Sequence, residues 1–173
     1  MSDRESGADT TLDAFRAELL RWNRQINLVS RRGTPRRIDD LVRQCGAACD
    51  VLIRHERKAG KDLAAEPLLY CDLGAGGGLP GFVWHERLRQ EGARLQSWLV
   101  EPREKRAWFL QRVARLQDPE PYGVLEGRWG EVCAPALLRA DTVLISLKAL
   151  RLTDPDVLAG LQALGGGVAT LPP

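Results

Sequence analysis

Residues 68–81 constrain the fold of this chain more than any other stretch of the sequence. An apolar run at 68–73, which contains Asp72, leads into the glycine-dense turn 74–78. Pro80 follows, and proline suits the first turn of a helix. Because glycine adopts positive φ angles and lets backbone approach a neighbouring group closely, the stretch predicts a buried strand, a tight loop and a helix start.

Such a loop has three interpretations. In a dinucleotide-binding fold it places a pyrophosphate at a helix N-terminus, with an acidic residue on a ribose roughly 20 residues later. A methyltransferase that uses S-adenosylmethionine (SAM) has a similar turn, often with an acidic residue two positions before the first glycine, where Asp72 stands. The third interpretation is a glycine-rich loop without a ligand, since such motifs produce false positives. The position of Asp72 favours the methyltransferase.

Length and composition are those of one globular domain. The 173 residues can bury a sizeable core, and 44% of them are hydrophobic and 28% charged. No apolar run approaches the roughly 20 residues that span a membrane, and the polar N-terminus does not resemble a signal peptide. The four cysteines have neither zinc-site nor disulfide-framework spacing. We therefore expect a cytoplasmic protein without a metal site.

Positive charge is concentrated in one segment, although the net charge is only +2. Seven arginines but only two acidic residues lie between Arg21 and Arg43. Four of these arginines stand close together in the segment Arg31-Arg32-Gly33-Thr34-Pro35-Arg36-Arg37. A basic loop of this kind is either a phosphate-contacting patch or an ordinary solvated loop, and the sequence leaves both open.

Hydrophobic periodicity predicts two helices followed by alternating strands and helices. Residues 1–9 are expected to form a disordered leader, and an apolar stripe predicts a helix at 10–26. A second helix is expected at about 38–57. Strands are expected at 68–73, 95–100, 122–125, 142–147 and 168–171, and helices at 80–90, 105–116, 132–138 and 153–164. The chain thus divides into a leader with a helical prefix, 1–66, and an α/β core, 67–173, within one compact domain.

This alternation predicts a Rossmann-like α/β fold, a mostly parallel sheet of about five strands with helices on both faces. Ligands of such sheets bind beyond the carboxyl ends of the strands, an edge that we call the rim. The rim would carry residues 72–78, Glu101, 127–130 and 147–148. Glu101 is either a surface glutamate or a carboxylate that accepts both ribose hydroxyls of an adenosine moiety. Asp72 could face the positive end of SAM or cap the glycine turn.

Six sequence pieces together resemble the bacterial glucose-inhibited division protein B family, the 16S ribosomal RNA (guanine-N7) methyltransferases G. The pieces are Trp22-Asn23, Asn27-Leu28-Val29-Ser30, Leu41-Val42-Arg43, residues 72–81, Lys105-Arg106-Ala107-Trp108-Phe109-Leu110 and Gly127-Arg128. The resemblance covers about residues 12–150. Its most specific parts are the Gly-Leu-Pro-Gly ending of the glycine loop and the Lys-Arg-x-x-Phe-Leu helix.

The resemblance implies a SAM-dependent enzyme that methylates N7 of one guanine in small-subunit ribosomal RNA. By similarity Gly74, Leu79, Trp129 and Gly130 would line the cofactor, together with the loop and strand candidates Asp72, Gly76, Gly78 and Glu101. Arg31, Arg32, Arg36 and Arg37 would hold RNA phosphates, and Lys148 would replace a family arginine near cofactor and target. Guanine N7 carries a lone pair and no proton, so the transfer needs alignment rather than a general base.

Several positions depart from the family pattern. Gln44 stands where the family has histidine, Lys148 where it has arginine, and Gly130 where it has glutamate. Relatives also continue past the fifth strand with a helix and an antiparallel strand pair, so an open edge is expected, which a homodimer would cover. Two alternatives therefore stay open: a degenerate relative that binds SAM or RNA without turnover, and a nicotinamide-dependent oxidoreductase.

Overall fold

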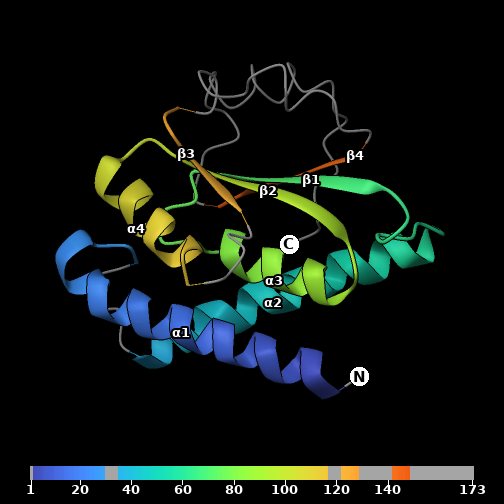
Figure 1. Cartoon of the computed structure of the whole chain (residues 1–173), viewed down its shortest axis with the longest axis horizontal. Coiled ribbons are helices and arrows are strands. Elements are labelled where there is room, and N and C mark those ends of the chain that lie inside the picture. The colour runs from blue at the N-terminus through green and yellow to red at the C-terminus, as the bar shows by residue number, and fades with distance from the viewer. Residues whose placement is uncertain (1, 30–34, 117–121, 129–141, 149–173) are drawn as a thin grey trace.

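The computed structural model describes residues 2–29, 35–116, 122–128 and 142–148, with side chains from Thr11 onward. In this part of the chain two helices precede a sheet whose strands alternate with further helices (Figure 1). The helices are α1 (Ser2–Ile26), α2 (Pro35–Lys58), α3 (Gly81–Gln90) and α4 (Glu104–Ala114). The strands are β1 (Pro67–Leu73), β2 (Arg94–Glu101), β3 (Gly123–Glu126) and β4 (Thr142–Leu147).

The described strands form one parallel sheet in the order β3-β2-β1-β4. The chain moves outward from β1 to β2 and β3, then returns to the other side of β1 with β4. The order reverses between β1 and β4, which is the switch point where sheets of this kind bind ligands. The predicted Rossmann-like fold is confirmed, but the described sheet has four strands rather than five. The expected strand at 168–171 and the expected helices at 132–138 and 153–164 lie outside the described residues.

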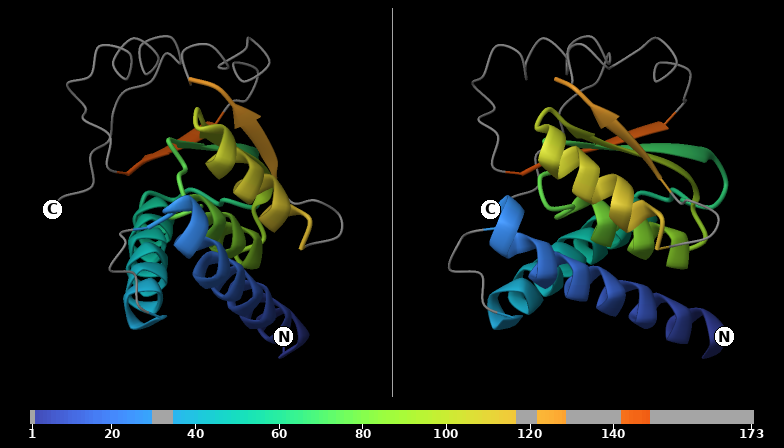
Figure 2. Two further views of the ribbon diagram at one scale, coloured as in Figure 1. Left: turned by 90° about the vertical axis from the view of Figure 1, so that its left-hand side faces the viewer. Right: turned by 60° about the vertical axis from the view of Figure 1, so that its left-hand side comes forward.

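All four described helices lie on one face of the sheet (Figures 1 and 2). The side chains of β1 point alternately to the two faces, as successive residues of a strand do. Leu68 and Tyr70 join the large buried cluster that contains side chains from all four helices. Leu69, Cys71 and Leu73 belong to a smaller buried cluster on the opposite face. Both faces of β1 are therefore apolar, as in central strands of parallel sheets.

Helix α1 packs its apolar stripe onto α3. Phe15 and Leu19 are fully buried, and the ring of Phe15 stacks on Phe82 of α3 with 4.3 Å between centroids. The expected disordered leader is wrong, because α1 already begins at Ser2. Its first residues contain no proline and include Ser2 and Asp3, types that favour a helix N-terminus, and one glycine lowers helix stability by only about 1 kcal/mol.

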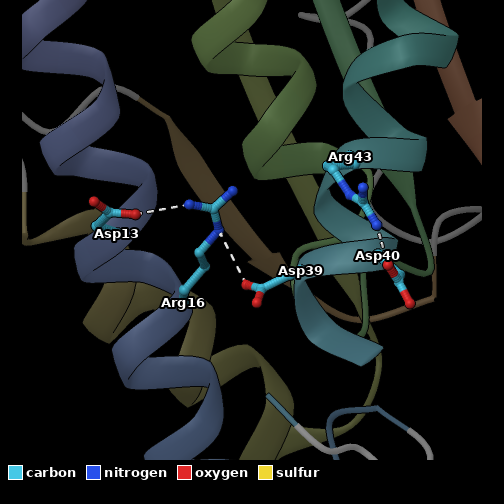
Figure 3. A network of polar contacts seen from close by, with 5 residues as sticks. All are labelled: Asp13, Arg16, Asp39, Asp40 and Arg43. Atoms are coloured by element: carbon cyan, nitrogen blue, oxygen red, sulfur yellow. Dashed lines mark hydrogen bonds and ion pairs between the residues drawn. The ribbon is translucent and has the colours of Figure 1, made fainter. Parts of the chain in front are cut away.

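One ion pair connects α1 and α2 at the surface, beside two pairs that each lie within one helix, as Figure 3 shows. Arg16 of α1 contacts Asp13 on its own helix at 2.7 Å and Asp39 of α2 at 3.7 Å. Arg43 pairs with Asp40 one turn away on α2. Partly exposed pairs of this kind contribute up to about 1 kcal/mol each, so burial of the apolar stripes does most to hold the two helices in place.

Gly81 marks the closest approach between α3 and the sheet. A Cβ atom at this position would lie 2.5 Å from Oδ2 of Asp72 and 2.5 Å from Cδ2 of Leu99. Neither neighbour can move freely, since both residues are at most 1% exposed. Gly46 in α2 is not crowded, because the nearest atom to a Cβ added there would be Cγ1 of Val83 at 4.0 Å.

We expect Gly81→Ala and Gly46→Ala to change the free energy of unfolding in opposite directions. Overpacking at Gly81 should destabilise the fold by about 1–3 kcal/mol. Alanine at Gly46, in a helix interior with space for a methyl group, should stabilise it by about 0.5–1 kcal/mol. Urea unfolding monitored by tryptophan fluorescence measures both, and equal effects would contradict the packing described at the start of α3.

Candidate cofactor site at the carboxyl edge of the sheet

Backbone hydrogen bonds bring two loops to the end of β2. The N–H groups of Gly74 and Ala75, which follow β1, both donate to the carbonyl of Val100 at 2.9 and 3.0 Å. The N–H of Gly127, which follows β3, donates to the carbonyl of Glu101 at 3.3 Å. The last two residues of β2 therefore anchor the loops that come from the strands on either side.

The side chain of Glu101 completes this anchor from a buried position, with 3% of the residue exposed. Its Oε2 accepts a hydrogen bond from the Gly76 N–H at 2.8 Å, and its Oε1 accepts one from the Arg103 N–H at 3.0 Å. The surface-glutamate interpretation is therefore wrong. An ionised carboxylate offers about four acceptor sites, so each oxygen keeps capacity for one further donor.

The glycine loop has two parts with different surroundings. Gly74 and Gly76 adopt positive φ angles of 75° and 58°, and an added Cβ at Gly76 would meet nothing closer than 3.7 Å. A Cβ at Gly77, by contrast, would lie 3.1 Å from Leu28 in the segment after α1. At Gly78 it would lie 3.3 Å from both Phe15 and Leu110. The second part of the loop is thus glycine-rich because the helical prefix packs on it.

Gly78 and Leu79, both predicted to bind the cofactor, lie in the packed interior rather than on the open side of the loop. Leu79 is 6% exposed and belongs to the large buried cluster. Their role toward a cofactor stays a prediction. Among Gly76, Gly77 and Gly78, only Gly76 has room for a Cβ atom at ordinary contact distances.

Asp72 is fully enclosed and tied to protein groups on both oxygens. Oδ2 accepts the Gly81 N–H at 2.9 Å, and Oδ1 accepts the Ser146 hydroxyl at 2.5 Å. The Ser146 hydroxyl in turn lies 2.8 Å from the Tyr70 hydroxyl. This geometry is that of a cap on the turn and on the start of α3; a contact with SAM stays a prediction.

Burial raises the pKa of Asp72 to about 6, against the usual 3.8. The hydrogen bonds from Ser146 and Gly81 and the positive charge of Lys148 act in the opposite direction, and the negative charge of Glu101 adds to the rise. Desolvation therefore dominates, as expected for a carboxyl group with 1% of its residue exposed.

Arg106 joins the helical prefix to the glycine loop and was missed from the sequence. Its guanidinium donates to the carbonyl of Asn27 at 3.0 Å and lies 3.8 Å from the Cβ position of Gly76. Asn27 itself has a positive φ of 56°, a conformation that asparagine tolerates better than most residues. Burial lowers the pKa of Arg106, and the nearby Arg103 lowers it further. The sequence feature that could have pointed to Arg106 is its position next to Lys105, within one of the six pieces that resemble the family.

The remaining predicted residues lie around this arrangement or outside the described residues. Lys148 is exposed and directly follows β4, whose last residue Leu147 pairs with Leu73 of β1. Arg36 and Arg37 are exposed in the first turn of α2. Gln44 is an exposed residue of the same helix. Arg31, Arg32, Trp129 and Gly130 lie outside the described residues.

Among residues 11–29, 35–116, 122–128 and 142–148, no three His, Cys, Asp or Glu side chains gather in a way that could hold a metal ion. No helix of the described part combines the length and the apolar character needed to cross a membrane.

Comparison with known proteins identifies the family. The family model for rRNA small subunit methyltransferase G, GidB, matches residues 9–150, which include the helical prefix, the glycine loop, Glu101 and Lys148. The chain belongs to this family. The resemblance read from the six sequence pieces is therefore confirmed. The match gives no support to the nicotinamide alternative.

Several relatives named ribosomal RNA small subunit methyltransferase G are similar to this GidB-family chain. The protein of Nitratidesulfovibrio vulgaris (strain DP4) is 36% identical over 157 residues, which are 88% of this chain and 65% of the relative. The protein of Chelativorans sp. (strain BNC1) is 31% identical over 157 residues, 88% of this chain and 68% of the relative. The protein of Acidovorax sp. (strain JS42) is 38% identical over 106 residues, 61% of this chain and 45% of the relative. The chain thus matches 65% of the length of the Nitratidesulfovibrio relative.

Asp72→Asn should make the stability of this chain less dependent on pH between about 4 and 6. The folded-state pKa of Asp72 lies above its usual value, so its favourable contribution is complete below about pH 4 and is lost as the pH rises to about 6. Across this window the wild type should lose on the order of 3 kcal/mol relative to Asp72→Asn. Urea unfolding of both proteins at pH 4, 5, 6 and 7 measures the difference, and a constant difference would contradict the raised pKa.

Proposed function

We propose that this chain binds SAM at the rim and transfers its methyl group to N7 of a guanine in 16S ribosomal RNA. Membership of the rRNA small subunit methyltransferase G family supports the reaction class. The observation that carries the proposal for this chain is the buried Glu101. It stands at the carboxyl end of β2, held by the Gly76 and Arg103 amides, beside the less crowded first part of the glycine loop.

The residues of the rim fit an adenosine-containing ligand. Each Glu101 oxygen keeps one acceptor site, which matches the two adjacent hydroxyls of a ribose. Gly76 lacks a Cβ atom, and the position that a Cβ would take is not crowded, so a ligand can approach the backbone there. When bound, SAM supplies an electrophilic methyl group on a positively charged sulfur. Asp72 supports this site indirectly, because it holds the turn and the start of α3.

The proposed methyl transfer requires alignment of the reacting atoms rather than removal of a proton. The N7 atom of guanine has a lone pair and no proton, so the protein has to place this nitrogen in line with the methyl group and its leaving sulfur. Lys148 follows β4 at the switch point of the sheet, where its cation can hold the target nucleotide beside the cofactor. The lysine keeps the charge of the family arginine but has no planar fork for two parallel hydrogen bonds.

Arg36 and Arg37 are proposed to contact RNA phosphates together with Arg31 and Arg32. Both lie in the first turn of α2, which contains no acidic residue. The backbone dipoles make this end of a helix positive, so helix and side chains attract phosphate together. Guanine N7 lies on the major-groove edge, which A-form RNA hides, so the target base must be unpaired or locally opened.

Calorimetric titration with SAM tests the cofactor site, with Glu101→Ala as the variant and Glu126→Ala as the matched control. Glu126 ends β3 and pairs in register with Glu101, but it is exposed, so the control removes the same charge from a neighbouring strand end. We expect micromolar binding by the wild type and the control, and at least a tenfold weaker affinity for Glu101→Ala. Equal affinities of the two variants would contradict the ribose role of Glu101, and no binding by the wild type would contradict the cofactor.

Methyl transfer to unmodified small ribosomal subunits tests the role of Lys148. Lys148→Ala should lower kcat by about tenfold or more, because one positioning charge is removed, while the affinity for SAM stays the same. Lys148→Arg should retain activity. A wild-type chain that binds SAM but transfers no methyl group would support the alternative of a degenerate relative.

A further inference from the structure

A second feature lies outside the rim, on the outer sides of α1 and α4. We call it the Trp108 surface. It consists of Arg21, Trp22, Trp108, Gln111, Arg112, Arg115 and Leu116. Trp108, Gln111, Arg112, Arg115 and Leu116 line a hollow of about 290 Å³. The role proposed above for the rim uses none of these residues.

Trp108 is unusual for its helix because 43% of it is exposed. The next two residues, Phe109 and Leu110, are fully buried and hold α4 on the sheet. The core therefore does not require a large aromatic side chain at position 108. Leu116, two turns further along, is also 42% exposed, so an apolar area remains at the surface.

Trp108 packs against a neighbour that is itself held by a hydrogen bond. Trp22 of α1 meets it edge-to-face, with 4.8 Å between centroids and 75° between planes. Glu18 accepts hydrogen bonds from Nε1 of Trp22 at 2.9 Å and from Nε of Arg112 at 2.6 Å. The Arg112 hydrogen bond is the main reason why the pKa of Glu18 is lowered. An aromatic ring with fixed neighbours binds a flat ligand at a small cost in side-chain entropy.

Arginines surround this aromatic pair. The guanidinium groups of Arg21 and Arg112 each lie 5.5 Å from the centroid of the Trp22 ring. The side chain of Arg21 is 63% exposed, and Arg115 contributes a further guanidinium to the hollow. Exposed aromatic rings beside arginines suit single-stranded nucleic acid, in which bases stack on rings and phosphates meet cations. The positive charge of the arginines favours single-stranded nucleic acid over an apolar partner protein at this surface.

The surface also begins next to the rim. Helix α4 starts at Glu104, three residues after Glu101, and Trp108 follows one turn later. Four residues of helix correspond to about 6 Å. Figure 1 shows the start of α4 and the end of α1 on the same side of the molecule. An RNA strand that places a base at the rim can therefore continue across the Trp108 surface.

We propose that the Trp108 surface binds single-stranded RNA, with Trp108 stacking on an unpaired base and Arg21 contacting a phosphate. The proposal rests on the proposed function, because it takes the substrate to be RNA. It adds an RNA contact on the outer sides of α1 and α4, beside the rim, to which the family resemblance gave no role. The contribution of the stacking contact to RNA affinity should depend little on salt concentration. The contribution of the arginine contact should fall as the salt concentration rises.

The experiment measures fluorescence anisotropy of a labelled, unstructured 12-nucleotide RNA with the wild type, Trp108→Ala, Trp108→Phe and Val51→Ala. Val51 is the control because it is an equally exposed apolar residue, 44%, on the separate helix α2. We expect Trp108→Ala to weaken binding about 5- to 100-fold, from the loss of one stacked base. Trp108→Phe keeps a ring and should stay within about threefold of the wild type, and Val51→Ala should equal the wild type. Trp108→Ala should keep the salt dependence of the wild type, whereas Arg21→Gln should reduce the slope by about one.

Two further measurements separate the possible outcomes. Calorimetry with SAM on the same proteins should give equal affinities for the wild type and Trp108→Ala. If the wild type does not bind SAM, the proposed function is overturned, but the RNA affinities of the wild type and the variants can still be compared. RNA affinity of Trp108→Ala equal to that of Val51→Ala would overturn the stacking contact. Analytical sedimentation tests whether the wild type forms a dimer that Trp108→Ala abolishes. If it does, and the RNA affinity is unchanged, the Trp108 surface joins two copies of the chain and the stacking contact is overturned.

Discussion

The hydrogen bonds accepted by the buried carboxylate of Glu101 are the interaction on which the rim depends. They connect the glycine loop after β1, through Gly76, to the turn that starts α4, through Arg103. A carboxylate paired only with backbone amides is costly to bury unless all its acceptor sites are used or reachable by solvent or ligand. This explains why a ligand with two neighbouring hydroxyl groups suits the position. The same residue thus organises the loops and recognises the ribose in the proposed function.

The helical prefix is part of the same arrangement. Leu28 lies against Gly77, Phe15 lies against Gly78, and Arg106 connects the Asn27 carbonyl with the region of Gly76. The segment that leads from α1 toward the arginine-rich loop therefore rests directly on the glycine loop. In the proposed function, the RNA contacts of that loop and the cofactor contacts of the rim would therefore be connected through these few packed residues.

Much of this organisation could be predicted from the sequence, because it depends on local patterns. The apolar runs and their spacing gave β1, β2, β3 and β4 to within a few residues and placed Glu101 at the end of β2. What could not be predicted depends on contacts between distant segments. Nothing in the spacing of the glycines distinguishes Gly76, with space beside it, from Gly77, which accommodates Leu28. The hydrogen bond from Ser146 to Asp72 and the bridge made by Arg106 likewise become visible only when β4 and α1 are placed.

In the proposed function, SAM binds at the rim where Glu101 holds the Gly76 and Arg103 amides. The most direct measurement follows the amide signals of the ¹⁵N-labelled chain by NMR during titration with S-adenosylhomocysteine, the demethylated cofactor. A cofactor site at the rim predicts saturable shifts of the Gly76 and Arg103 amides, with the Val51 amide on α2 unchanged. Shifts that leave Gly76 and Arg103 unchanged, or no shifts at saturating ligand, would contradict it.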